Sequence, residues 1–483
     1  MQYPKIIHHG AVEGVTGSCH QLALDAALSL LIDCGLFQGE EAATQHRLNP
    51  EGASFENVVA SIKALVITHV HADHVGRLPE LLAAGFKGPI LCSEPSALLL
   101  PVVLEDAFSI QYSHDGALVE RYLKQIAERV IALPFDHWFG IVDTQELKCR
   151  IRLQRAGHIL GSAYVECDVE YPLENRSKRI VFSGDLGASD TPILPSPMSP
   201  ERADTLVLES TYGDRLHEDR STRHERLEKV IEQALADQGT ILIPAFSLGR
   251  TQELLYEIED ILHRKAIPVS VAAKSETTQA GGMGVDWPTL PIILDSPLAT
   301  RLTAVYEGLA DYWDEEATLR AAGGRNPLNF KQLIKVETHA DHLQVVNYLT
   351  STRRPAIVIA GSGMCSGGRI VDYLKAMLGD PRHNVVFVGY QAKGTPGASI
   401  QKHGPQGGYV ELDRERYDIH AGITTLGGYS AHADQQGLVK FVTEMSQWPS
   451  EIRLVHGEPQ ARKALRSVLM RKYELKRMPL IIE

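Results

Sequence analysis

Four of the seven residues in the stretch 68–74 can bind a metal ion, and they follow the pattern H-x-H-x-D-H: His69, His71, Asp73 and His74. The apolar run 64–67 before them predicts a buried strand, and leucines at helical spacing in 75–84 predict a helix after them. A turn this tight cannot direct every side chain at one ion. We therefore expect the first two histidines to serve one ion, and Asp73 and His74 a second. Imidazole with carboxylate suits zinc, with manganese or iron as alternatives. The other interpretation is a polar loop that is merely rich in histidine.

Three further candidates lie where predicted strands end. His158 follows the alternating segment 147–155, and Asp185 follows the apolar segment ending at Phe182. Either could be an ordinary turn residue, but their recurrence at strand ends favours metal binding, and the two oxygens of Asp185 could bridge two ions. Asp33 ends the strand 28–32. It could equally form a turn or orient a metal-bound histidine from outside the coordination shell.

In order along the chain, H-x-H-x-D-H, Gly-His158 and Ser-Gly-Asp185 resemble the metallo-β-lactamase superfamily, and Asp33 matches its first acidic position. The resemblance implies two β-sheets sandwiched between helices, with a two-metal site at one edge. This superfamily hydrolyses many substrates, so the resemblance alone does not give a function.

The composition is that of a globular protein without a membrane span. The chain has 483 residues, of which 44% are hydrophobic, and no apolar run approaches the ~20 residues that span a bilayer. Its length predicts two domains. No signal-peptide pattern is evident, and the six scattered cysteines contain no C-x-x-C pair. These features predict a cytoplasmic protein. The net charge of −12 taken alone argues against nucleic-acid binding, although two bound ions would add local positive charge.

Beyond the strand 205–209, which ends in Glu209, strand and helix patterns alternate as far as residue 388. This alternation predicts an inserted α/β domain with a parallel sheet. Two strand-to-helix loops in this insert, 244–250 and 361–369, could bind phosphate through free backbone N–H groups, although such loops are usually only turns. The candidate phosphate or RNA contacts in these loops are Ser247, Arg250, Ser362 and Gly363.

Histidines return near the C-terminus. His432 lies in Ser-Ala-His-Ala-Asp, and His456 ends the strand pattern 452–455 in Leu-Val-His-Gly-Glu. Together with Glu209 in Glu-Ser-Thr-Tyr-Gly, they resemble motifs A, B and C of the β-CASP nucleases. The resemblance covers nearly the whole chain and is strongest to RNA-cleaving members. DNA-repair members usually carry valine where this chain has His456.

The resemblance implies specific roles at a site with two Zn²⁺ per chain, or Mn²⁺ as the alternative. His69, His71 and His158 would hold the first ion, and Asp73, His74 and His456 the second, with Asp185 bridging. His432, beside Glu209, would protonate the leaving 3′-oxygen during phosphodiester hydrolysis. Single-stranded RNA would be the substrate, cut internally, from the 5′ end, or both.

The implied domains are a first metallo-β-lactamase part (1–208), an inserted β-CASP domain (209–395) and a C-terminal metallo-β-lactamase part with RNA-specificity motifs (396–483). Rival functions are a DNA exonuclease of the same fold, a thioester or lactam hydrolase, and a scaffold without activity. The inserted domain and the three motifs argue against the hydrolase, and the filled ligand positions argue against the scaffold. The sequence leaves open whether the protein forms a homodimer.

Overall fold

The computed structural model describes residues 3–37, 41, 55–266, 287–352 and 354–483. Contacts divide the chain into two compact units, one formed by 1–216 with 431–483 and the other by 217–430. The second unit is thus inserted into the first. Its limits differ from the predicted limits of the insert, 209 and 395, and the three-part assignment of domains stays a prediction. Among the described residues, no helix combines the length and apolar character that crossing a membrane requires.

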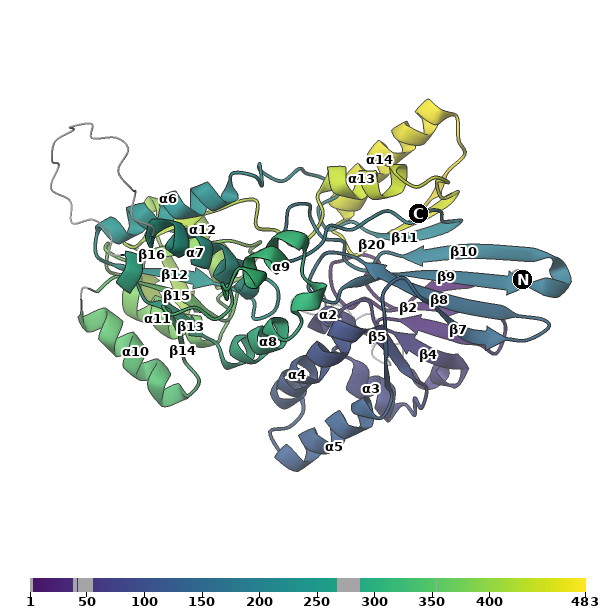
Figure 1. The fold of residues 1–483 in the computed structure, drawn as a ribbon, viewed down its shortest axis with the longest axis horizontal. Coiled ribbons are helices and arrows are strands. Elements are labelled where there is room, and N and C mark those ends of the chain that lie inside the picture. Colours follow the sequence, from purple (N-terminus) through teal and green to yellow (C-terminus); the bar gives the residue numbers. More distant parts are fainter. Residues whose placement is uncertain (1–2, 38–40, 42–54, 267–286, 353) are drawn as a thin grey trace. The chain divides into compact units, whose positions relative to one another are not determined.

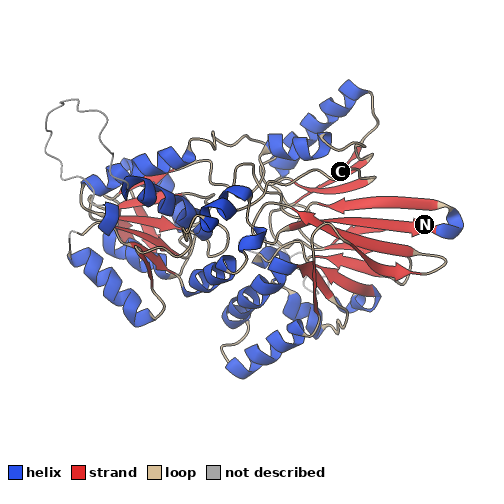
Figure 2. Cartoon of the chain, viewed as in Figure 1, coloured by secondary structure: helices blue, strands red, loops and turns tan. Residues whose placement is uncertain are grey.

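The first unit contains two β-sheets (Figures 1 and 2). The six-stranded sheet runs in the order β1 (Lys5–His8), β2 (His20–Ala23), β3 (Ser29–Ile32), β4 (Ile62–Val66), β5 (Ile90–Ser93), β6 (Val130–Leu133). The seven-stranded sheet runs in the order β21 (Ile481–Ile482), β20 (Glu451–Val455), β11 (Thr205–Glu209), β10 (Arg176–Phe182), β9 (Ala163–Tyr171), β8 (Lys148–Arg155), β7 (Trp138–Asp143).

The two sheets share one core. In β8, Cys149, Ile151 and Leu153 are buried, and they alternate with more exposed polar side chains, as expected of a strand with one apolar face. They join a cluster that includes Leu30 and Ile32 of the other sheet, so the sheets pack face to face.

Helices cover the outer faces. They are α2 (Ala72–Val75), α3 (Leu78–Ala83), α4 (Glu94–Gln111), α5 (Gly116–Ala127), α13 (Gln435–Thr443) and α14 (Pro459–Lys476). Helix α4 packs on β5 and β6, whereas α13 and α14 share a separate core cluster with β10, β11 and β20. The predicted sandwich of two sheets between helices is therefore confirmed.

The second unit is built on a parallel sheet in the order β14 (Leu333–Lys335), β13 (Ile292–Asp295), β15 (Ala356–Ala360), β12 (Thr240–Pro244), β16 (Asn384–Phe387), β19 (Gly422–Thr425). Its helices are α6 (Arg223–Ala236), α7 (Arg250–Ala266), α8 (Pro297–Glu307), α9 (Glu315–Ala322), α10 (His339–Ser351), α11 (Arg369–Met377) and α12 (Pro396–His403), and β17 (Tyr409–Leu412) with β18 (Glu415–Asp418) forms a hairpin. Strands β12 and β15 are buried throughout, as their continuous apolar sequences require of central parallel strands. The predicted α/β insert is confirmed.

Strand direction collects the candidate ligands at one edge of each sheet in the first unit. Strands β3 and β4 are parallel, so Asp33 and the stretch 68–74 leave the first sheet at the same edge. Strands β10, β11 and β20 are mutually parallel, and β8 has the same direction because β9 is antiparallel to both β8 and β10. The residues that follow these four strands therefore share one edge of the second sheet.

Gly35 permits the close approach of two segments at this edge. A Cβ added there would lie only 1.5 Å from the backbone oxygen of Asp73. The loop after β3 therefore cannot carry a side chain at this point without displacing the stretch 68–74.

We expect Gly35→Ala to destabilise the protein by about 1–3 kcal/mol or more, because the overlap involves backbone rather than a flexible side chain. The matched control is Gly140→Ala in β7, where an added Cβ meets no atom within 4 Å. The midpoints of thermal unfolding of both variants are measured in the presence of a chelator, so that the effect of packing on stability is separated from the effect of metal binding. Equal midpoints for the two variants would contradict the steric argument.

Candidate metal centre

The stretch 68–74 forms a tight turn that backbone hydrogen bonds hold in place. It leaves β4 and enters the single-turn helix α2, where the N–H of His74 donates to the carbonyl of His71 (2.9 Å). The N–H of Ser18 donates to the carbonyl of Asp73 (2.8 Å), and that of Cys34 to the carbonyl of His74 (2.7 Å). The ligand-bearing turn is therefore fixed from two other segments of the chain.

One group of side chains has the spacing of ligands around a single ion. Nδ1 of His71 lies 3.1 Å from Nε2 of His69 and 3.2 Å from Nε2 of His158. Oδ2 of Asp185 lies 3.5 Å from His69 Nε2 and 3.7 Å from His158 Nε2. Ligand atoms about 2.1 Å from a zinc ion, arranged tetrahedrally, are about 3.4 Å apart. The four side chains therefore match a tetrahedral site.

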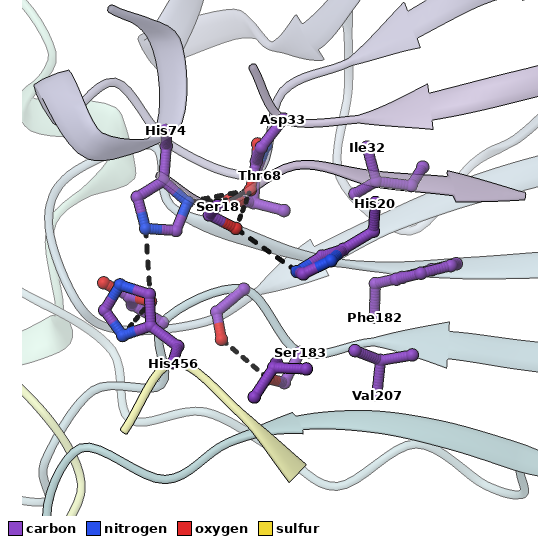
Figure 3. Close-up of a pocket in the computed structure, with 13 residues that line it drawn as sticks. Ser18, His20, Ile32, Asp33, Thr68, His74, Phe182, Ser183, Val207 and His456 are labelled. Atoms are coloured by element: carbon purple, nitrogen blue, oxygen red, sulfur yellow. Dashed lines mark hydrogen bonds and ion pairs between the residues drawn. The ribbon is translucent and has the colours of Figure 1, made fainter. Parts of the chain in front are cut away.

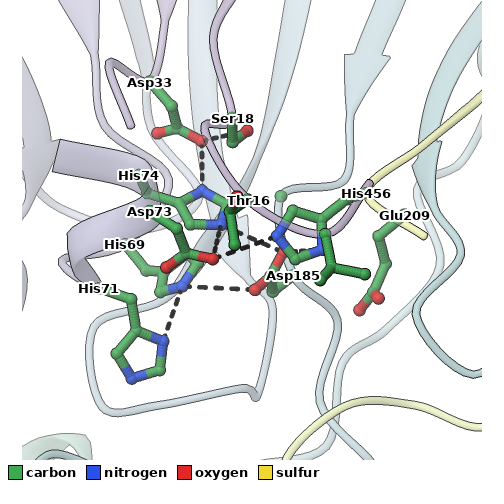
Figure 4. A network of polar contacts seen from close by, with 12 residues as sticks. Thr16, Ser18, Asp33, His69, His71, Asp73, His74, Asp185, Glu209 and His456 are labelled. Atoms are coloured by element: carbon green, nitrogen blue, oxygen red, sulfur yellow. Dashed lines mark hydrogen bonds and ion pairs between the residues drawn. The ribbon is translucent and has the colours of Figure 1, made fainter. Parts of the chain in front are cut away.

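Asp73, His74 and His456 form a second group next to Asp185 (Figure 4). Oδ2 of Asp73 is 3.3 Å from Nε2 of His456 and 3.9 Å from Nε2 of His74. Nε2 of His74 is in turn 3.4 Å from Oδ1 of Asp185. The two oxygens of Asp185 thus face different ligand groups, which is the arrangement of a carboxylate that bridges two ions.

Buried atoms between these side chains fit a cation. His74 Nε2 and Asp185 Oδ1 are buried and form no hydrogen bond with any residue that the structure describes. Burial acts to lower the pKa of His74, but Asp185, Asp33 and Asp73 together hold it well above its usual value. Burial and neighbouring imidazoles hold the pKa of His158 well below the usual value, so that ring is neutral and can act as a ligand. The carboxylates around His74 therefore provide negative charge, and His158 provides a neutral nitrogen, where a cation would lie.

Asp33 contacts a candidate ligand from behind. Its Oδ2 lies 2.8 Å from His74 Nδ1, and it accepts hydrogen bonds from the backbone N–H and the hydroxyl of Thr68, both at 2.8 Å. A proton on Nδ1 of His74 leaves Nε2 with its lone pair toward Asp73 and Asp185. Asp33 has a φ of +60°, which is uncommon outside glycine and is compatible with a functional constraint.

A small pocket lies behind the centre (Figure 3). Ser18 and His20 are among its polar lining residues, and Phe182 and Val207 contribute apolar surface. Nε2 of His20 is 3.4 Å from the hydroxyl of Ser18, which is 3.5 Å from Asp33 Oδ2. No metal-ligand motif in the sequence includes Ser18, His20 or Thr68 as a candidate, so these three residues were not predicted.

His432 and Glu209 face each other beside the ligand groups. Nδ1 of His432 is 3.3 Å from both carboxylate oxygens of Glu209 and 3.9 Å from Asp185 Oδ2. Glu209 is 1% exposed and His432 is 20% exposed, so the histidine is the member of the pair that solvent reaches. Burial acts to lower the pKa of His432, but Glu209 and Asp185 raise it above the usual value. The pair is thus arranged to keep a proton on the imidazole.

The chain holds this pair through backbone contacts. The N–H of Leu186 donates to Glu209 Oε1 (2.7 Å), and the N–H of Ala433 donates to the carbonyl of Leu186 (2.7 Å). The segment after Asp185 therefore contacts both sides of the pair.

The two predicted phosphate loops belong to the second unit, where they leave the neighbouring strands β12 and β15. They contact one another, because a Cβ on Gly363 would lie 3.0 Å from the ring of Phe246. Ser247 Oγ lies 3.2 Å from Ser296 Oγ, and Ser362 is half-buried.

Arg250, the fourth predicted contact, is largely buried. Its side chain is 8% exposed, and its guanidinium donates to Glu253 and lies 5.7 Å from the ring of Tyr429. Glu253 thus holds this side chain at the start of α7, and the phosphate contact of Arg250 stays a prediction.

Comparison with known proteins agrees with this arrangement. Residues 25–245 match the metallo-beta-lactamase superfamily, 251–400 match the Beta-Casp domain, and 416–478 match the Zn-dependent metallo-hydrolase RNA specificity domain. The chain is 35% identical over 466 residues to "Ribonuclease TTHA0252" of Thermus thermophilus, and the match covers 96% of each chain.

Archaeal proteins are also similar. The chain is 32% identical to "Transcription termination factor FttA" of Pyrococcus abyssi, over 86% of this chain and 60% of that protein. It is 29% identical to the factor of the same name from Methanococcus maripaludis, over 89% of this chain and 63% of that protein. The clustered histidines and aspartates bind divalent metal, and the protein is a metal-dependent nuclease. The chain belongs to the β-CASP family of RNA nucleases within the metallo-β-lactamase superfamily.

Proposed function

We propose that this protein hydrolyses phosphodiester bonds of single-stranded RNA with two zinc ions per chain. The observation that carries the proposal is the position of Asp185, whose oxygens lie 3.5 Å from His69 in one ligand group and 3.4 Å from His74 in the other. The match of 416–478 to an RNA specificity domain and the ribonuclease name of a relative support RNA as the substrate.

The spacing of the candidate ligands supports the two sets that the family resemblance implies. His69, His71 and His158 would hold one ion, and Asp73, His74 and His456 the other, with Asp185 between them. When bound, two such ions supply positive charge to the phosphate and activate a water molecule for in-line attack. The ligand side chains would fix the positions of the two ions, and the positive charge of the ions would orient the scissile phosphate.

His432 would supply the proton for the leaving 3′-oxygen. Glu209 faces its Nδ1 at 3.3 Å, so the opposite ring nitrogen would deliver the proton. Because Glu209 favours the charged imidazole, His432 can remain protonated near neutral pH and be ready to act as the general acid. A general acid makes the departing oxygen a better leaving group without binding a metal itself.

The loops of the second unit would bind the RNA backbone. Ser247, Ser362 and the backbone around Gly363 lie where β12 and β15 end, the edge at which parallel α/β sheets commonly bind ligands. Hydroxyl and N–H donors can bind phosphate without a cationic side chain. A protein with a net charge of −12 can therefore bind RNA through such groups and the metal centre.

The function is tested with RNA and DNA of matched sequence, labelled internally or at one end, and carrying a 5′-phosphate or a 5′-hydroxyl. We expect cleavage of single-stranded RNA and little cleavage of DNA. The pattern of labelled products separates internal cutting from digestion at the 5′ end. His158→Ala, prepared identically, controls for a contaminating ribonuclease. Cleavage of DNA in preference to RNA would contradict the proposal.

Metal content is expected to be about two zinc equivalents per chain, because the seven candidate ligands form two groups. His456→Ala should lower it toward one equivalent and remove most activity. His137→Ala changes an exposed histidine outside the site and should leave both unchanged. Elemental analysis of the three proteins checks this. Active protein with only traces of transition metal would exclude the mechanism.

Loss of His432 should slow the reaction without loss of metal. We expect His432→Ala to retain both ions and to cleave ordinary RNA about 10²- to 10⁴-fold more slowly, as for a missing general acid. A phosphorothiolate or nitrophenyl ester needs less protonation of its leaving group, so the variant should cleave it nearly as fast as the unmodified protein does. If the variant is equally slow on both substrates, or loses an ion, His432 is not the acid.

A further inference from the structure

Thr211 connects the proton-donating pair to the metal centre. It lies in the turn after β11, two residues beyond Glu209, and no role was assigned to it from the sequence. We infer that Thr211 is a positioning residue whose hydroxyl fixes the ring of His456 for binding of the second ion and ties that ring to the carboxylate that orients His432. This inference rests on the proposed two-metal function.

The hydroxyl of Thr211 lies between a carboxylate and an imidazole. Oγ1 is 2.6 Å from Oε2 of Glu209 and 3.2 Å from Nδ1 of His456. A hydroxyl has one proton, and the shorter contact with an ionised acceptor takes it, so Thr211 donates to Glu209. The oxygen of Thr211 then accepts the N–H of His456 Nδ1.

This direction of hydrogen bonding selects the tautomer of His456. A proton on Nδ1 leaves the lone pair on Nε2, the nitrogen that lies 3.3 Å from Asp73 Oδ2 in the second ligand group. Asp33 does the same for His74, because its carboxylate lies 2.8 Å from His74 Nδ1. Both histidines of the second group thus have an outer partner on Nδ1, as metal-binding histidines generally do.

Glu209 joins this contact to the proton-donating pair. Its Oε2 accepts the hydroxyl of Thr211 and also lies 3.3 Å from His432 Nδ1. Its burial leaves little freedom to rotate, because Oε1 accepts the N–H of Leu186 (2.7 Å). One carboxylate therefore orients two histidines with different roles, one of them through Thr211.

The backbone of His456 has an uncommon conformation and is held by the turn after β11. His456 has a φ of +50°, a left-handed conformation that is uncommon for a residue with a side chain. The N–H of Ser210 donates to the carbonyl of His456 (3.2 Å), and the hydroxyl of Ser210 donates to the carbonyl of Val455 (2.7 Å). The turn after β11 therefore holds the backbone of His456, whose carbonyl also lies 3.2 Å from Thr211 Oγ1, and Thr211 in addition contacts the side chain.

Two substitutions distinguish the effect of the Thr211 hydroxyl from the effect of its side-chain packing. Thr211→Val has nearly the same shape and removes only the hydrogen-bonding group, whereas Thr211→Ser keeps the hydroxyl and removes the methyl group. The affinity of each protein for zinc is measured by competition with a chromophoric chelator, and the visible spectrum is recorded after substitution with cobalt. We expect Thr211→Val to bind the second ion 10- to 100-fold more weakly, with the first ion unaffected.

The same variant should lose kcat at subsaturating zinc while its KM for RNA stays unchanged, because Thr211 is assigned to orient His456 rather than to bind RNA. Thr211→Ser should restore the zinc affinity, the cobalt spectrum and kcat. Thr211→Val that binds both ions as tightly as the unmodified protein would overturn the inference. Equal weakening in both variants would also overturn it, because the methyl group would then be the important part.

The outcomes distinguish this inference from the proposed function. If the unmodified protein cleaves RNA without binding zinc, the two-metal proposal itself is wrong. If the unmodified protein binds two ions and Thr211→Val binds them with equal affinity, the proposed function stands and only the role of Thr211 is rejected.

Discussion

Buried negative charge at one edge of the sandwich is the constraint on which the site depends. Asp185 is 3% exposed and lies within 4 Å of five imidazoles, those of His69, His74, His158, His432 and His456. A buried carboxylate is costly unless it is paired with positive charge or coordinates a metal ion. The strand ends place nitrogen ligands on both sides of it, so divalent ions can meet this requirement.

Two candidate ligands, His74 and His456, have outer hydrogen-bond partners that select one nitrogen of each of these two rings. Asp33 and Thr68 act behind His74, and Thr211 and Glu209 act behind His456. These partners are themselves held by the backbone, for example through the N–H of Thr68. Because imidazole can bind through either nitrogen, the tautomer is as much part of the site as the identity of the ligand.

The fold was largely predictable because it follows from local patterns, whereas the full division of the candidate ligands into two groups came from the family resemblance. Apolar runs predicted β4, β10 and β11, and each is followed by a polar candidate that the structure brings into the cluster. Thr211 could not be recognised in this way. Its partner His456 is 245 residues away, and only the parallel pairing of β11 with β20 brings them together. The position of the Arg250 side chain was not predictable for a related reason, because its guanidinium donates to Glu253 one helical turn later. A glycine-rich loop shows where backbone N–H groups are available but not where a neighbouring side chain points.

The insertion of the second unit also separates the times at which the candidate ligands are synthesised. Asp73 and His456 are neighbours across 383 residues of sequence, and residues 217–430 lie between them. At a synthesis rate of 5–20 residues per second, roughly 20 to 80 s separate the appearance of these two residues at the ribosome. The growing chain carries H-x-H-x-D-H during this interval but lacks His456 until its end, and His432 until 24 residues before that. A nascent chain on the ribosome, which itself contains RNA, therefore cannot assemble both proposed ligand groups until His456 has been made.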